Sequence, residues 1–187
     1  MTNGPEFTLT ITVGDEAQDF ALGTEALVSL FSGGVHADRA EFAGALAAAA
    51  HHPAASVRRA VAAHDHLPGD AAMTLATDPC ASVRAELLRS AIFRRIAPEA
   101  TIVALIESDP DVAMSVAELV AQFENADINV LCAALAAHPD PSVRRALADG
   151  GGAPLKWLKK LRDDPAPDVA GRALFQLVSR AGGGRSA

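Results

Sequence analysis

The sequence predicts a mostly α-helical protein, built as a right-handed α-solenoid of helical repeats that carries a small β-hairpin at its N-terminal end. Three observations predict this class. The chain of 187 residues contains 41 alanines and no tyrosine, which suits closely packed helices because alanine is the best helix former. A short motif recurs along the chain at similar intervals, as it does in stacked repeats. Strand-like alternation is confined to the first 22 residues.

Residues 1–35 are expected to form the hairpin and a capping helix. Residues 7–13 alternate apolar side chains with threonine, and this strict period of two is typical of a strand with one buried face. Residues 14–16 supply turn chemistry, and residues 19–22 repeat the alternation more weakly. Because an isolated hairpin is marginal in water, its apolar face should cover either the first helices, as a cap on the first repeat, or a second copy of the chain.

A motif that opens with Asp-Pro or His-Pro recurs five times in the rest of the chain. Its copies begin at His52, Asp78, Asp109, His138 and Asp164, with apolar anchors at residues 57, 83, 114, 143 and 169. The anchors are therefore 26, 31, 29 and 26 residues apart. Proline fits the first turn of a helix because its missing N–H costs nothing there. Each copy is thus expected to start a helix whose apolar face continues four residues beyond the anchor.

A second apolar helix is expected between consecutive motifs, and three of these helices are also opened by a proline, at Pro68, Pro98 and Pro154. Each unit is therefore helix, turn, helix. One such unit cannot bury its apolar face alone, so neighbouring units must stack. We expect the helical-repeat solenoid to span residues 36–180. Residues 181–187 are expected to be a disordered tail.

The motif "(Asp/His)-Pro-x-x-x-Val-Arg", with a proline-led helix between its copies, resembles bacterial HEAT-like and leucine-rich-repeat-variant proteins over about residues 50–180. The resemblance implies a stack of paired helices that binds proteins and, in some members, nucleic acids. The variant-repeat family can also hold a cysteine-ligated iron–sulfur cluster. This chain has only Cys80 and Cys132, so no cofactor is expected, and both cysteines are interpreted as small buried core residues.

The arginines at the motif starts are the first candidate site. A cation near a helix N-terminus opposes the helix dipole, so each of these arginines should have a compensating partner. In HEAT-like proteins an aspartate before the proline and an arginine after the valine form a ladder along the stack. The resemblance therefore implies pairing of Asp78 with Arg84 and of Asp140 with Arg144. The alternative is a basic stripe that binds a partner.

The partner-binding candidates are Arg58, Arg59, Arg84, Arg94, Arg95, Arg144, Arg145 and Trp157. Trp157 is the sole tryptophan and lies among three lysines. We interpret it as core or end-cap packing; the alternative is a patch that stacks on bases and contacts phosphates.

No catalytic, metal or cofactor site is predicted. The histidines at residues 51, 52, 64 and 66 lie near the two ends of one expected helix of about 11 residues, so the two pairs are about 15 Å apart at 1.5 Å per residue. They cannot share one metal ion, and we interpret them as solvated turn residues. The chain shows no nucleophile elbow, and its triple glycine at 150–152 lacks the following Lys-Ser/Thr of a phosphate loop.

The formal net charge of −7 is unevenly distributed. Residues 1–50 hold seven acids and one base, whereas residues 51–187 hold 16 acids and 15 bases. A nucleic-acid binder usually shows a basic excess. The chain also shows neither a signal peptide nor a run of about 18 apolar residues, so a cytoplasmic protein without a membrane partner is expected.

The sequence thus favours a non-catalytic protein–protein interaction module, an adaptor or scaffold that binds a macromolecular partner on the solenoid surface. One alternative is a small inhibitor or immunity-type protein, since an acidic N-terminal end would attract a basic target. Another is a nucleic-acid-associated HEAT-like protein that uses the motif-start arginines. A homodimer through the unpaired edge of residues 7–13 is a further expectation.

Overall fold

The computed structural model describes residues 6–13, 16–32 and 39–183, and the chain divides into two compact units, Met1–Phe93 and Arg94–Ala187. The boundary expected at residue 35 lies outside the described residues, as do residues 184–187 of the expected tail. Residues 181–183 continue the last helix, so the expectation that the tail begins at residue 181 is wrong. No helix of the described part is long and apolar enough to span a bilayer.

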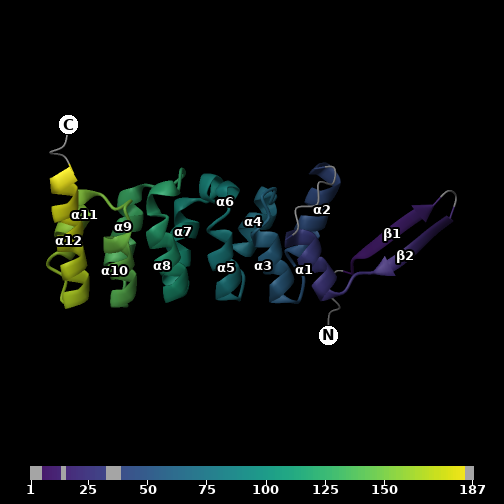
Figure 1. Ribbon diagram of the computed structural model, residues 1–187, viewed down its shortest axis with the longest axis horizontal. Helices are drawn as coiled ribbons and strands as arrows, with labels where there is room; N and C mark the ends of the chain where they lie inside the picture. The colour runs from purple at the N-terminus through teal and green to yellow at the C-terminus, as the bar shows by residue number, and fades with distance from the viewer. Residues whose placement is uncertain (1–5, 14–15, 33–38, 184–187) are drawn as a thin grey trace. The chain divides into compact units, whose positions relative to one another are not determined.

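The N-terminal hairpin is confirmed. Strands β1 (Thr8–Val13) and β2 (Glu16–Ala21) pair antiparallel, with Leu9 opposite Phe20 (Figure 1). Every side chain of β2 is exposed. The hairpin therefore does not bury its apolar face on the first helices, which corrects the expectation that it caps the first repeat. Phe7, just before β1, does pack inward, because its ring meets that of Phe31 edge-on at 6.1 Å between centroids.

The first unit arranges its helices in two rows. The helices are α1 (Thr24–Ser32), α2 (Arg39–Ala49), α3 (Ala55–Ala62), α4 (Gly69–Leu75), α5 (Ala81–Leu87) and α6 (Ala91–Ile96), the last of which reaches into the second unit. Helices α1, α3 and α5 pack side by side in one row, and α2 packs on α4 in the other. Large apolar residues such as Leu46, Leu75 and Leu87 are fully buried between the rows.

The second unit repeats this arrangement. Its helices are α7 (Glu99–Ser108), α8 (Pro110–Glu118), the short 3₁₀ helix η1 (Val120–Gln122), α9 (Ile128–Ala136), α10 (Pro141–Asp149), α11 (Leu155–Leu161) and α12 (Pro167–Gly183). Helices α8, α10 and α12 form one row, and α7, α9 and α11 form the other (Figure 1). The mostly helical class with a small hairpin is confirmed, whereas one continuous solenoid stays a prediction.

Four of the five predicted anchors are buried. Val57, Val83, Val143 and Val169 each keep at most 1% of their surface accessible. The fifth, Met114, is only half-buried, and the fully buried anchor of that helix is Val112. The reason is that α8 begins two residues earlier in the motif: Asp109 is its N-cap and Pro110 its first residue. Val112 lies three residues after its cap, as Val143 does after the cap Asp140.

Two glycines of the triple glycine allow two helix ends to approach each other closely. Gly150 ends α10 with a φ of −61° and a ψ of 123°, so it is not there to supply a left-handed conformation. A Cβ atom on Gly150 would lie 2.9 Å from the carbonyl oxygen of Ala117 in α8. One on Gly152 would lie 2.8 Å from the Cβ of Ala121. Larger residues at these two positions would push the ends of α8 and α10 apart.

Candidate functional site

The first residue of the motif forms a tight turn with its own side chain. Asp78 Oδ1 accepts a hydrogen bond of 2.8 Å from the backbone N–H two residues later, and Asp164 does the same at 2.9 Å. His52 and His138 use Nδ1 in the same way, at 3.1 Å each. An unprotonated imidazole nitrogen and a carboxylate oxygen are both acceptors. This shared role explains why either residue type occurs at this position.

In each unit, one arginine ties one motif to the next. In the second unit, Arg144 places Nε and Nη2 on the two carboxylate oxygens of Asp164 at 2.8 and 3.0 Å. Its Nη1 donates to the carbonyl oxygens of His138 and Pro139 at 2.8 and 3.0 Å. In the first unit, Arg58 makes the same four contacts with Asp78, His52 and Pro53. We call the pairs Arg58–Asp78 and Arg144–Asp164 the arginine rungs.

The rungs correct the expected ladder. Arg144 pairs with Asp164 and not with Asp140, whose carboxylate instead accepts from the Ser142 N–H as a helix cap. Asp78 pairs with Arg58, while Arg84 reaches only its backbone carbonyl oxygen through Nη1. The pairing runs forward over 20 residues, because the arginine side chain crosses to the neighbouring helix pair instead of turning back on its own motif.

The rungs are shielded from solvent, and in each rung the two opposite charges neutralise each other. The two arginine side chains keep 12% and 13% of their surface accessible, and the two aspartates 3% and 5%. Burial raises the pKa of Asp78, but hydrogen bonds from Arg58 and from the Cys80 N–H outweigh it and hold the pKa below its usual value. The hydrogen bond from Arg144 lowers the pKa of Asp164 in the same way. Arg58 and Arg144 are therefore neutralised internally.

The other arginine candidates belong to four different helices. Arg59, Arg95 and Arg145 are exposed. Arg94 is half-buried, and its carbonyl oxygen accepts from the N–H of Glu124. The Nε atom of Arg84 is buried without a hydrogen-bond partner in the described part of the chain.

Trp157 is half-buried against the α9 helix. Its Nε1 donates to Asn129 Oδ1 at 3.4 Å. The ammonium groups of Lys156 and Lys160 lie 5.6 and 5.2 Å from the centroid of its rings, within the range of a cation–π contact. The side chain is thus held by its own helix pair, and its ring is occupied by two lysines.

Two hollows contain charged residues. A groove of about 610 Å³ in the second unit is lined by Arg144, Asp164, Asp163 and Lys160 among others, and its main charges form a rung. A pocket of about 280 Å³ in the first unit contains His64. Burial lowers the pKa of His64, so that the imidazole is neutral near pH 7. His64 Nδ1 accepts from the His66 N–H, and Nε2 is buried without a partner in the described residues.

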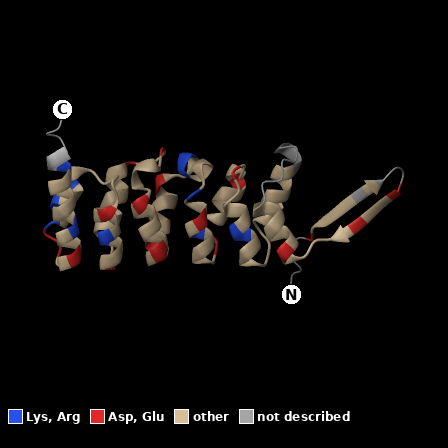
Figure 2. Ribbon diagram, viewed as in Figure 1, with Lys and Arg blue, Asp and Glu red and all other residues tan. Residues whose placement is uncertain are grey.

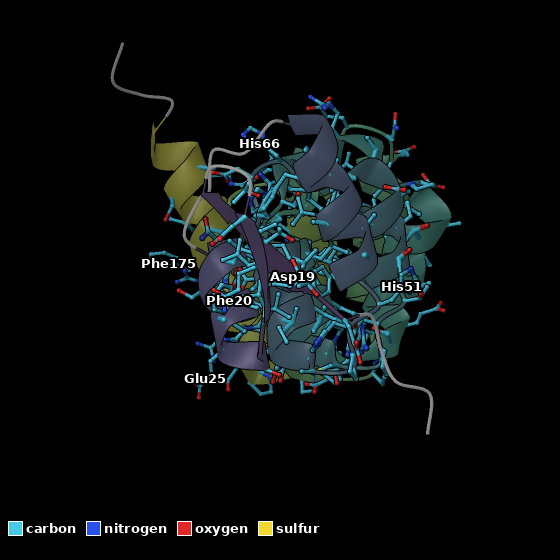
Figure 3. The ribbon with its side chains drawn as sticks, turned by 90° about the vertical axis from the view of Figure 1, so that its right-hand side faces the viewer. Asp19, Phe20, Glu25, His51, His66 and Phe175 are labelled. Carbon is cyan, nitrogen blue, oxygen red and sulfur yellow. The ribbon has the colours of Figure 1, made fainter. Side chains whose placement is uncertain are left out.

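The remaining predictions on histidine and cysteine are mixed. His51 and His66 lie apart on the surface of the first unit (Figure 3), whereas His64 is buried, so its assignment as a solvated turn residue was wrong. Cys132 is buried, which raises its pKa to about 11. Cys80 is only half-buried, with Sγ 3.2 Å from Ser82 Oγ. The described residues contain no cluster of three potential metal ligands.

The last helix carries an apolar surface that the sequence analysis missed. Leu174, Phe175 and Val178 of α12 keep 50%, 58% and 64% of their surface accessible. Leu174 and Phe175 lie four and three residues before Val178, so each of them neighbours Val178 on one face of the helix. We call these three residues the α12 ridge. In Figure 3 the side chain of Phe175 projects away from its helix.

The inner face of the same helix is firmly held. Val169 and Ala173 are buried. Arg180 donates to the carbonyl oxygens of Ala153 and Gly151, at 2.7 Å each, and Gln176 Nε2 donates to that of Asp149. These bonds tie α12 to the last residue of α10 and to the loop that follows it, so the ridge is presented on a firmly held helix. A signal was available in the sequence, since a helix with apolar residues on both faces indicates two buried surfaces.

The surroundings of the ridge are basic. Residues 151–187 hold seven bases and three acids, and Figure 2 shows the bases on α11 and α12. Arg172 pairs with Asp149, and its guanidinium carbon lies 5.0 Å from the centre of the Phe175 ring. Lys156, Lys159 and Lys160 form no ion pair with any described residue, and all three are exposed, whereas Trp157 is half-buried.

Comparisons with family models, with curated proteins and with solved structures found no match to this chain.

Proposed function

We propose that this protein is a non-catalytic protein-interaction module, built as a HEAT-like solenoid, that binds its partner on the α12 ridge. The observation that carries this proposal is the exposure of Leu174, Phe175 and Val178 on one face of a rigidly held helix. An apolar surface of this kind is unfavourable in water unless something covers it, and large exposed apolar patches mark interaction sites.

The internal pairing of the arginines supports a protein partner over a nucleic acid. Arg58 and Arg144 donate to carboxylates and carbonyls of their own unit. A phosphate would have to displace Asp78 or Asp164 from a shielded contact to reach them. The exposed arginines among the other candidates, Arg59, Arg95 and Arg145, belong to three different helices. The chain as a whole is acidic. The nucleic-acid function is therefore the weaker proposal.

The chemistry around the ridge specifies the partner further. Arg180 meets backbone carbonyls and no carboxylate among the described residues, so its charge is not cancelled by an ion pair. Three unpaired lysines lie on the neighbouring α11. Charged rims of opposite sign speed encounter and set the orientation of a complex. The partner surface is thus apolar at its centre and carries carboxylates at its edge, whether the protein serves as an adaptor or as an inhibitor.

The proposal is tested by affinity capture of the tagged protein from a lysate of its source, with and without nuclease. We expect a stoichiometric protein that survives nuclease and that is lost with Phe175→Asp. Leu155→Asp is the matched control, because Leu155 is a leucine on α11 that is 49% exposed, close to the 50% of Leu174. Capture that vanishes with nuclease, or that is unchanged by Phe175→Asp, would contradict the proposal.

A further inference from the structure

The hairpin has the surface that the α12 ridge requires. Leu9 and Phe20 are opposite each other in the register, so both side chains lie on one face of the two-stranded sheet. They keep 48% and 42% of their surface accessible. The other face is polar: Thr10 donates a hydrogen bond of 2.7 Å to Asp19 across the strands. An amphipathic two-stranded sheet with an open apolar face is marginal by itself in water.

The charges on the hairpin are all of one sign. Residues 6–32 contain the acids Glu6, Asp15, Glu16, Asp19 and Glu25 and no base. Figure 2 shows acidic residues and no basic ones along the hairpin, and Figure 3 shows Asp19 beside Phe20, with Glu25 at the start of α1. Of these acids, Glu16 lies on the same face as Phe20, because side chains four residues apart in a strand point the same way. Face-to-face pairing of two hairpins would therefore bring like charges together, which disfavours association. The basic surroundings of the α12 ridge are complementary to this surface.

We propose that the apolar face of the hairpin of one copy covers the α12 ridge of a second copy. The inference rests on the proposed function, since it uses the same ridge and names a second copy of this chain as its partner. Leu9 and Phe20 would lie on Leu174, Phe175 and Val178, with hairpin carboxylates near the bases of α11 and α12. A sheet face packed on a helix is an ordinary two-layer arrangement.

One feature of α12 fits close packing at this surface. Gly171 lies on the ridge face, three and four residues before Leu174 and Phe175. A Cβ atom there would meet nothing within 4 Å, so the fold of the chain itself does not require this glycine. A glycine inside a helix lowers helix stability relative to alanine. Its lack of a side chain leaves room for the backbone of a covering strand.

The proposed contact joins two different surfaces and is therefore heterologous. Each copy keeps one free hairpin and one free ridge after pairing, so assembly continues beyond the dimer unless the geometry closes a ring. Light scattering on the purified full chain should show an average mass that rises with concentration past that of a dimer. Raising the salt concentration should lower the average mass, because part of the attraction is between opposite charges.

Two variants separate the surfaces. Phe20→Asp removes the hairpin face, and Phe175→Asp removes the ridge; each alone should reduce the protein to a monomer. Ala17→Asp, on the polar face of the hairpin, and Leu155→Asp, on α11, should assemble as the unaltered chain does. An equimolar mixture of Phe20→Asp and Phe175→Asp should form a dimer and stop there, because one ridge and one hairpin remain intact. The mixture also covers the case in which Phe20→Asp unfolds the hairpin, since that copy still offers its ridge.

Three results would overturn the inference. The first is that the unaltered chain remains a monomer at every accessible concentration. A dimer abolished by Phe20→Asp but retained by Phe175→Asp is another, and it would assign the contact to two hairpins, including pairing through the β1 edge. A mixture that fails to associate is the third. If self-association fails while Phe175→Asp still removes a foreign protein from the capture experiment, the inference falls and the proposed function stands.

Discussion

The repeat starts of this protein differ in how they are held. At Asp78 and Asp164, a shielded arginine from the preceding motif forms an ion pair with the aspartate. The same arginine donates hydrogen bonds to two backbone carbonyls of its own motif. At the start of α8, the residue four positions after the cap Asp109 is Ala113, whereas the corresponding residues of α3, α5 and α10 are arginines. That start keeps its helix cap and its buried anchor, Val112. A cap and an anchor therefore suffice to begin a helix of this kind, and the rung is an added tie between neighbouring helix pairs.

The largest expected effect comes from removing a rung carboxylate. Asp78→Ala leaves the shielded guanidinium of Arg58 without its carboxylate partner and removes the turn hydrogen bond from the Cys80 N–H. Breaking one partner of a buried pair costs about 3–5 kcal/mol. Asp164→Ala should cost nearly as much in the second unit. The measurement is the free energy of unfolding from urea titrations followed by circular dichroism, with Glu118→Ala at an exposed position as the control.

A loss below about 1 kcal/mol for Asp78→Ala, in the range of exposed ion pairs, would contradict the view that the rungs hold neighbouring repeats together. An equal loss for the control would show that the assay reports something other than the rung.

Acid should weaken the same ties. The pKa values of Asp78 and Asp164 are lowered in the folded protein, so the unfolded chain binds protons first as pH falls. Their stabilisation is complete above the unfolded aspartate pKa of about 3.9 and is lost as pH falls from there through the folded values. The melting temperature should therefore drop steeply below about pH 4.

Asp78→Asn paired with Arg58→Met keeps an acceptor for the Cys80 N–H and removes the titrating pair of the first unit. Melting temperatures of this double variant between pH 6 and pH 3 should fall less steeply than those of the unaltered chain. An unchanged slope would assign the acid sensitivity to other groups. The pKa of His64 is also lowered in the folded protein. His64 therefore affects stability in a different pH range, which begins near its unfolded pKa of about 6.5.

The start without a rung should be less sensitive. Asp109 caps α8 by accepting from the Asp111 N–H at 2.9 Å, and its side chain has no arginine in the described structure. Asp109→Ala should cost about 1 kcal/mol, as is usual for a lost N-cap. The same urea titration gives the value. A cost equal to that of Asp78→Ala would erase the distinction between the two kinds of start.

The smallest effect should have the opposite sign. Gly171→Ala adds a methyl group in open space on α12 and should stabilise the monomer by about 0.5–1 kcal/mol, because alanine is the better helix former. Thermal unfolding of the Phe175→Asp background, which removes self-association from the measurement, gives this value. A loss of stability there would show that Gly171 is required by the chain's own packing.

The parts of the fold that local pattern determines were predictable. The alternation in residues 7–13 gave the hairpin, and the proline-led motifs gave the helix pairs. The anchor of α8 was placed two residues late because Asp109-Pro110 matches Asp78-Pro79 in letters. Pro110, however, opens its helix at once, whereas Pro79 precedes the cap of the next helix.

The partners of the rung arginines and the exposure of the ridge could not be predicted from local sequence patterns. Arg144 meets Asp164 only because two helix pairs stack, and the sequence contains a nearer acid, Asp140, that competes for the assignment. The exposure of Phe175 likewise depends on which face of α12 packs against the rest of the second unit, and the hydrogen bonds from Arg180 help to fix that face. Both features are set by packing between repeats.

We propose that the rungs serve stability and that the α12 ridge serves binding. The most direct test compares, in one capture experiment, Phe175→Asp with the charge-free rung variants Arg58→Met/Asp78→Asn and Arg144→Met/Asp164→Asn. Each variant is first shown by circular dichroism to be folded. We predict that both rung variants retain the captured partner and that Phe175→Asp loses it. Loss of the partner from a folded rung variant, with retention by Phe175→Asp, would contradict the claim and return binding to the arginines.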